Sequence, residues 1–280
     1  MTNEHTAWEA AWIAAVRESS INVMLDTLRS AMAASSNRKP QTVTHRALLL
    51  MEAELHSNPA RLQQLTHKLS GYSDAAAQEL AVFLLANQFP INPEAANLKL
   101  MQLADSPFKE VRDWSARAAG TLLGKHFRLF YPLIVLWTQH ASANVRLASL
   151  LAVKYAAASR SLVDPEKLLD LTESLLSDTD AAIKKALGAP VLGSGLLPLY
   201  PEQVYRRMER WLEADTPGAR WHIARLFATA EAAQRWELLQ PLFAKLAADP
   251  RAMIRKAVQK AVQFLSKRIA DDPLLLSVLE

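Results

Sequence analysis

A short sequence pattern recurs along this chain at intervals of 34 to 38 residues. In each copy, a turn element rich in Asp, Ser or Pro precedes a small aliphatic marker residue; a basic residue often follows the marker, and then an alanine. The markers are Val43, Ala77, Val111, Val145, Ile183, Ala219 and Ile254. An interval of this size is typical of arrays in which each unit is a pair of helices that cannot bury its apolar face alone. The sequence therefore predicts an all-α fold, an α-solenoid of about seven HEAT-like helix pairs in a right-handed superhelix.

The composition agrees with a helical array. Half of the 280 residues are hydrophobic and only 7 are glycine, which disfavours a disordered chain and favours helices. Apolar residues recur at helical spacing, for example at Val258, Val262 and Leu265. No segment alternates apolar and polar residues over any length, so we expect no sheet.

We expect a single repeat domain over residues 1–280, with capping helices in 1–40 and the repeats in 41–280. The predicted buried side of the capping helices comprises Trp8, Trp12, Val16 and Leu25. One irregularity is expected where glycine and proline cluster, between Gly188 and Pro198, because Pro190 should end or kink the helix that contains it.

Several classes of protein are excluded by what the chain lacks. It contains no cysteine, which rules out disulfides, thiol catalysis and Cys-ligated metals. The apolar runs are too short to span a bilayer, and the first residues carry no secretory signal, so we expect a cytoplasmic protein without membrane contact. The usual nucleotide-binding and hydrolase motifs are absent, and the seven histidines are scattered. We therefore expect no cofactor and no metal.

A column of basic residues follows the markers. Arg112, Arg146, Lys184, Arg220 and Arg255 each stand one residue after a marker, and Lys185 and Lys256 extend the column. One interpretation is a stripe that contacts DNA phosphates, since aligned cations can follow a polyanion. The other is a structural ladder, in which each cation pairs with an acidic turn residue of a neighbouring repeat. The residues alone leave both interpretations open.

Two further features of the sequence stand out. The segment Arg251–Arg268 carries six cations and no acidic residue, so it is the densest positive segment of the chain, although such a run can also be a solvated helix face. Asp113 and Trp114 are adjacent, and a carboxylate beside an indole could stabilise a cationic sugar or base. The alternative is a buried tryptophan beside a capping or salt-bridged aspartate.

The middle of the chain resembles a known family. The run from Trp114 to Phe127, the segment from Asn144 to Tyr155 and the element Ile183-Lys-Lys-Ala-Leu-Gly188 occur in an order and spacing similar to the DNA-alkylation-repair family of HEAT-like proteins, the alkylpurine DNA glycosylases of the AlkD and AlkC type. Trp137, and Tyr200–Val204 with Trp211, continue the likeness. It covers about residues 105–270 and rests on the phasing rather than on long identity.

The resemblance implies a solenoid that binds DNA on a basic concave face and excises cationic alkylated purines. Arg146 matches the family's arginine that contacts the DNA backbone. The family's catalytic aspartate falls near Ala116, and a family tryptophan is replaced by Ala189. Three alternatives follow. Asp113 and Trp114 serve as the catalytic pair, or this chain binds DNA without cutting the glycosidic bond, or it no longer binds nucleic acid.

Two functions follow from these observations. The first is double-stranded DNA binding, with glycosylase activity left open; the second is a non-enzymatic scaffold that binds another protein, the commonest use of helical solenoids. We expect a monomer in either case. The predicted DNA contacts are Arg112, Arg146, Lys184, Lys185, Arg220, Arg255 and Lys256.

Overall fold

The computed structural model describes residues 6–34, 40–159 and 164–279, and every regular element in these ranges is a helix. The chain forms two compact units, Met1–Ala118 and Ala119–Glu280. The predicted all-α fold is confirmed. The predicted single domain over residues 1–280 stays a prediction. Within the described ranges, no helix combines the length and apolar character needed to cross a bilayer.

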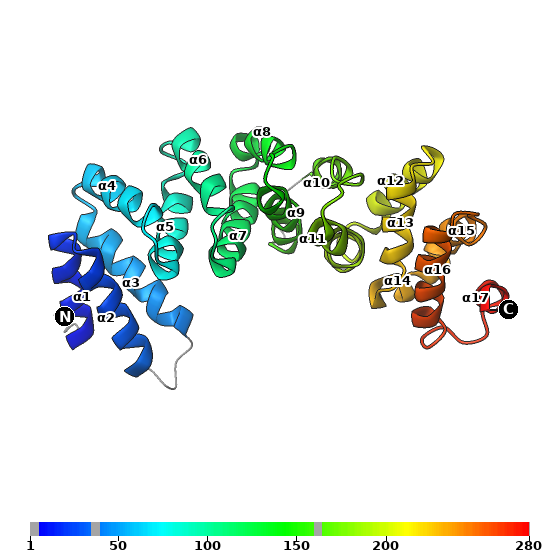
Figure 1. Ribbon diagram of the computed structural model, residues 1–280, viewed down its shortest axis with the longest axis horizontal. Helices are drawn as coiled ribbons and strands as arrows, with labels where there is room; N and C mark the ends of the chain where they lie inside the picture. The colour runs from blue at the N-terminus through cyan, green and yellow to red at the C-terminus, as the bar shows by residue number, and fades with distance from the viewer. Residues whose placement is uncertain (1–5, 35–39, 160–163, 280) are drawn as a thin grey trace. The chain divides into compact units, whose positions relative to one another are not determined.

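The first unit is built from helices that pack in order along the chain (Figure 1). They are α1 (Ala7–Glu18), α2 (Ile21–Ala34), α3 (Pro40–Leu55), α4 (Pro59–Ser70), α5 (Ala75–Gln88), α6 (Pro93–Leu103) and α7 (Lys109–Lys125), which continues into the second unit. Helix α3 packs on α1 and α5, while α4 and α6 pack on α5. The side chains of Asn58, Asp74 and Asn92 accept hydrogen bonds from the first turns of α4, α5 and α6, which fixes where these helices begin.

The second unit stacks its helices in two rows. Its elements are α8 (Phe127–Thr138), α9 (Ala143–Ala158), α10 (Pro165–Glu173), α11 (Ala181–Ala186), the π-helix η1 (Leu187–Leu196), α12 (Pro201–Glu213), α13 (Pro217–Leu226), α14 (Ala230–Gln234), α15 (Trp236–Ala247), α16 (Ala252–Leu265) and α17 (Pro273–Leu279). One row runs from α9 through α11 and η1 to α13 and α16; the other runs from α10 through α12 to α15. Neighbouring repeats of this unit therefore stack with equivalent helices in contact.

The marker residues confirm the predicted repeat. All seven are at most 5% exposed. They lie near the start of α3, α5, α7, α9, α11, α13 and α16. Each of these helices follows a partner helix, which gives the expected pairs. The right-handed superhelix stays a prediction.

The predicted capping region is helical, and three of its four expected core residues are buried. Trp12, Val16 and Leu25 are buried, and the indole N–H of Trp12 donates to the carbonyl of Ala47 at 2.8 Å. Trp8 differs, because its side chain keeps partial contact with solvent. The polar break expected before Pro40 lies largely outside the described residues.

The expected irregularity is a π-helix rather than a helix end at Pro190. The α-helical geometry ends at Ala186, and η1 carries the chain through Pro190 to Leu196. A π-helix places its hydrogen bonds five residues apart, which accommodates a proline that an α-helix would exclude. Two glycines let η1 approach α13 and the turn after it: a Cβ at Gly188 would lie 2.8 Å from the carbonyl oxygen of His222, and one at Gly193 would lie 2.7 Å from Thr229 Cγ2.

A polar side chain one residue after the marker links each of three repeats to the turn of the next repeat. We call this set of contacts the ladder. In the first unit, Gln78 Oε1 accepts from Ser106 Oγ at 2.6 Å. In the second unit, Arg146 Nε donates to Asp178 Oδ2 at 2.7 Å. Two repeats later, Arg220 Nη1 donates to Asp249 Oδ2 at 3.1 Å.

Two arginines that stand one residue after a marker, Arg146 and Arg112, also hold the turn before their own helix. Arg146 Nη1 donates to the carbonyls of His140 and Ala141, 2.8 Å from each. Arg112 Nη1 makes the equivalent contacts to the carbonyls of Ser106 and Pro107 at 2.8 and 3.1 Å. A guanidinium can do this because its donors form a rigid fork that reaches several acceptors at once.

The two aspartate acceptors of the ladder are kept ionised. Burial would raise the pKa of Asp178, but the hydrogen bonds from Arg146 and from the backbone of Asp180 outweigh burial and leave the pKa below its ordinary value. Hydrogen bonds led by that from Arg251 lower the pKa of Asp249 to about 2. Since these pKa values are depressed in the folded state, the contacts of Asp178 with Arg146 and of Asp249 chiefly with Arg251 stabilise the fold above pH ~4. This contribution disappears as the pH falls through the folded-state pKa.

Substitution of Arg146 by alanine should therefore lower the free energy of unfolding by about 2 kcal/mol, because it leaves a buried carboxylate without its charged donor. The matched control is Arg255→Ala, since Arg255 stands at the same repeat position but is exposed. It should change the free energy by less than about 0.5 kcal/mol. Urea unfolding at pH 7 measures both, and equal losses would contradict a structural role for the ladder.

Candidate functional site

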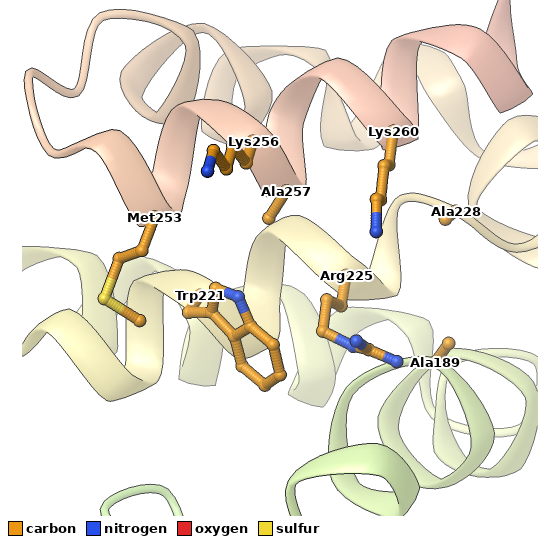
Figure 2. Close-up of a pocket in the computed structure, with 8 residues that line it drawn as sticks. All are labelled: Ala189, Trp221, Arg225, Ala228, Met253, Lys256, Ala257 and Lys260. Carbon is orange, nitrogen blue, oxygen red and sulfur yellow. The ribbon is translucent and has the colours of Figure 1, made fainter.

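A pocket of ≈530 Å³ opens between α13 and α16 of the second unit (Figure 2). It is lined by Ala189, Trp221, Arg225, Ala228, Met253, Lys256, Ala257 and Lys260. We call it the basic pocket, because three of these side chains are cations and none of these eight described residues carries a carboxylate.

Helical spacing explains why these side chains share one face. Trp221 and Arg225 are four residues apart on α13, and Lys256 and Lys260 are four residues apart on α16. Residues at this spacing lie above one another on a helix. The helices α13 and α16 pack together. Ala257, buried between the two lysines, leaves room for that approach.

The charges of the basic pocket are only partly neutralised by the protein. The guanidinium of Arg225 lies 4.7 Å from the centroid of the Trp221 ring, at cation–π distance, and its Nε is buried without a hydrogen-bond partner among the described residues. Lys256 and Lys260 are exposed, and in Figure 2 the amine of Lys260 points toward α13. Such a concentration of one charge attracts anions.

A second hollow of ≈350 Å³ shares Trp221 and Met253 with the basic pocket, since both residues line both cavities. It is lined by Leu176, Ser177, Asp178, Lys184, Gly218, Trp221, His222 and Met253. Met253 is 48% exposed, so a flexible thioether borders both hollows at the surface. Lys184 adds a fourth cation to this face.

His222 sits beneath this face as a buried, neutral base. Its side chain is 1% exposed, and its Nδ1 has no hydrogen-bond partner among the described residues. Burial, with the nearby charges of Arg225 and Lys184, lowers its pKa to about 4. It therefore carries no charge at pH 7 and leaves the positive charge of the site to the lysines and Arg225.

The structure distributes the predicted DNA contacts among three environments. Lys184 and Lys256 line the two hollows. Lys185 and Arg255 are exposed outside those linings. Arg112, Arg146 and Arg220 bind backbone carbonyls, and the last two also bind the aspartates of the ladder, as the alternative interpretation of the basic column predicts.

Asp113 and Trp114 point to different neighbours. An oxygen of Asp113 lies 2.9 Å from Nζ of Lys109, and both side chains are well exposed. The ring of Trp114 packs on Phe83, with centroids 5.2 Å apart, and lines a separate hollow of the first unit. Their catalytic role stays a prediction. Ala116, where the family's catalytic aspartate is expected, is buried.

The repeat spacing in the sequence could have predicted that Trp221 and Arg225 share a face with Lys256 and Lys260. They stand two and six residues after the marker Ala219, and Lys256 and Lys260 stand two and six residues after Ile254. We call these the outer positions of a repeat. Lys185 and Ala189 are the outer positions after Ile183, so Ala189, where the resembled family carries tryptophan, belongs to the same register.

Comparisons with known proteins show similarity to other helical repeat structures and nothing more specific. No family model matches the chain, and no curated protein matches it significantly. Among solved structures, YibA of Escherichia coli is 10% identical, covers 100% of this chain and 97% of its own, and has a TM-score of 0.37. A designed armadillo repeat protein in complex with the peptide (KR)4 is 17% identical over 93% of this chain and 100% of its own, with a TM-score of 0.36.

A C-terminal fragment of the cohesin loader SCC2 from Chaetomium thermophilum is 15% identical, covers 92% of this chain and 22% of its own, and has a TM-score of 0.31. At such identities and scores the likeness carries no information on activity or partner.

The buried histidine predicts a pH effect on stability. Between pH 6.5 and about 4, the unfolded chain protonates His222 while the folded chain does not, so stability falls as the pH falls, by up to about 3 kcal/mol. In His222→Leu this part of the loss should vanish. Urea unfolding of both proteins at pH 7, 6, 5 and 4 isolates it as their difference, and parallel pH curves would show that His222 titrates normally.

Proposed function

We propose that this helical repeat protein binds double-stranded DNA through the basic pocket of its second unit. The observation that carries the proposal is the convergence of Arg225, Lys256 and Lys260 on one pocket whose lining contains no carboxylate among the described residues. Lysine and arginine contacts to phosphates supply most of the affinity of proteins for DNA. The planar surface of Trp221 with the stacked Arg225 adds a platform on which a base could stack.

The family resemblance supports the same partner. It implies a DNA-binding repeat protein related to the alkylpurine DNA glycosylases. Excision of cationic bases is the finer part of the proposal, and it requires Asp113 to supply a negative charge beside Trp114. In the structure, Asp113 instead forms an ion pair with Lys109. We therefore infer DNA binding first and treat excision as a separate property of the first unit.

A specific observation favours a second candidate, a protein-binding scaffold. Arg146 and Arg220 are engaged inside the protein, which removes two cations from the predicted phosphate stripe. If the remaining cations are too few to hold DNA, the repeat array would serve as a scaffold for another protein.

Duplex binding against salt concentration tests the first candidate. The double variant Lys256→Gln/Lys260→Gln should bind about tenfold or more weakly at low salt. It should also lower the slope of log K against log salt by about 2, because each lost phosphate contact removes about 0.9. Fluorescence anisotropy with a labelled duplex at several salt concentrations measures both quantities.

The matched control is Lys68→Gln/Lys245→Gln, which removes the same charge from exposed lysines of α4 and α15. It should leave most of the affinity in place. Equal losses in the two double variants would show non-specific attraction, and no salt-dependent binding by the wild type would leave the scaffold as the better candidate.

Excision is tested separately with Asp113→Asn. If the chain releases alkylated purines from DNA, this variant should release them at least about a hundredfold more slowly, because the neutral amide cannot stabilise a developing cation. Release of methylated base from alkylated duplex, measured by chromatography, is the readout. An unchanged rate would exclude Asp113 from the chemistry.

A further inference from the structure

A small pocket of the first unit has a chemistry opposite to that of the basic pocket. It has a volume of ≈240 Å³ and is lined by Thr44, His45 and Leu48 of α3, Glu79 and Phe83 of α5, and Trp114 of α7. The rings of Phe83 and Trp114 are 5.2 Å apart between centroids and inclined at 55°, so they form two walls that meet at an angle. We call this the aromatic pocket.

Glu79 brings a carboxylate to these aromatic walls without a counter-ion. Burial raises its pKa, and within the described residues the structure records no hydrogen bond or ion pair to its side chain. The neighbouring carboxylates of this unit differ: Glu9 and Glu54 accept from the Nε atoms of Arg46 and Arg17 at 2.6 and 2.7 Å. A partly buried carboxylate that lacks such a partner is costly, and a bound cation would relieve that cost.

The aromatic walls suit the same kind of ligand. The face of an indole or phenyl ring attracts a cation held within about 6 Å of its centroid. Trp114 already shows this property, because the guanidinium of Arg117 lies 5.9 Å from its ring centroid. A carboxylate and two aromatic rings that line one cavity are together the elements that recognise an organic cation rather than a neutral apolar group.

We propose that the aromatic pocket binds the alkylammonium head of a lysine side chain, methylated or not, presented by a partner protein. The cavity is smaller than the roughly 300–1,000 Å³ of small-molecule sites, so it fits one side-chain head. Leu49 lies one helical turn beyond His45 on α3 and is 46% exposed, which offers apolar surface for the backbone that carries the lysine. This interaction concerns a cation in the first unit, so it stands or falls apart from DNA binding in the second.

The test is a titration of the full chain with Nα-acetyl-lysine amide and its ε-trimethyl form. The readout is the indole N–H signal of Trp114 in a nitrogen–proton NMR spectrum, identified by its loss in Trp114→Phe. Both cations should shift the signal with saturation at millimolar concentration. The uncharged analogue Nα-acetyl-norleucine amide has nearly the same shape and should not, and an equal shift with it would overturn the proposal.

Two variants separate charge from aromatic contact. Glu79→Gln keeps the shape of the side chain and should weaken binding of the trimethyl form about tenfold or more. Phe83→Leu keeps the charge and should weaken it about threefold to tenfold. The matched control is Glu94→Gln on α6, an exposed carboxylate that should leave the affinity unchanged.

Equal affinity of Glu79→Gln and the wild type would refute the role of the carboxylate. Duplex binding by Glu79→Gln, measured under the same conditions, should equal that of the wild type. The outcome for the aromatic pocket is thereby independent of the outcome for duplex binding by the second unit.

Discussion

One polar contact between successive repeats sets the register on which both pockets depend. The side chain that follows the buried marker reaches the turn of the next repeat, as Gln78 to Ser106, Arg146 to Asp178 and Arg220 to Asp249. Apolar packing alone is non-directional and tolerates sliding of one helix along another. A bond from a half-buried side chain to a fixed turn does not, because a shifted helix would leave a buried polar group unsatisfied. The ladder therefore fixes how far each helix is shifted along its neighbour, which apolar packing alone would leave variable.

That alignment gives each unit a face made of its outer positions, and the two units use the face differently. In the last two repeats of the second unit the outer positions hold Trp221 and Arg225, then Lys256 and Lys260. In the repeat of the first unit that begins at Ala77 the same positions hold Glu79 and Phe83. The same structural position thus presents cations at the basic pocket and a carboxylate with an aromatic ring at the aromatic pocket. The repeat supplies the placement of side chains, and their identities decide whether an anion or a cation is attracted.

The sequence predicted much of the fold and less of the site. The repeat interval, the helical class and the burial of all seven markers could be predicted because they follow from local apolar spacing. The residues of the basic column lie in three different environments, which the sequence did not distinguish. Successive residues of a helix are turned by about 100°, so Arg220 of the column and the adjacent Trp221 point to different surroundings. The first binds Asp249 and the second lines the basic pocket.

The sequence by itself determined where helices begin and which residue of each enters the core, since caps, prolines and apolar periodicity act within a few residues of one another. Only the tertiary structure decided which charged side chains form ion pairs within the protein and which remain available to a ligand. Arg146 and Asp178 are 32 residues apart in the chain, and Glu79 meets Trp114 only because α5 and α7 bring them to one cavity. Such pairings depend on distances between separate helices, and those distances are set by packing of the whole unit rather than by any local pattern.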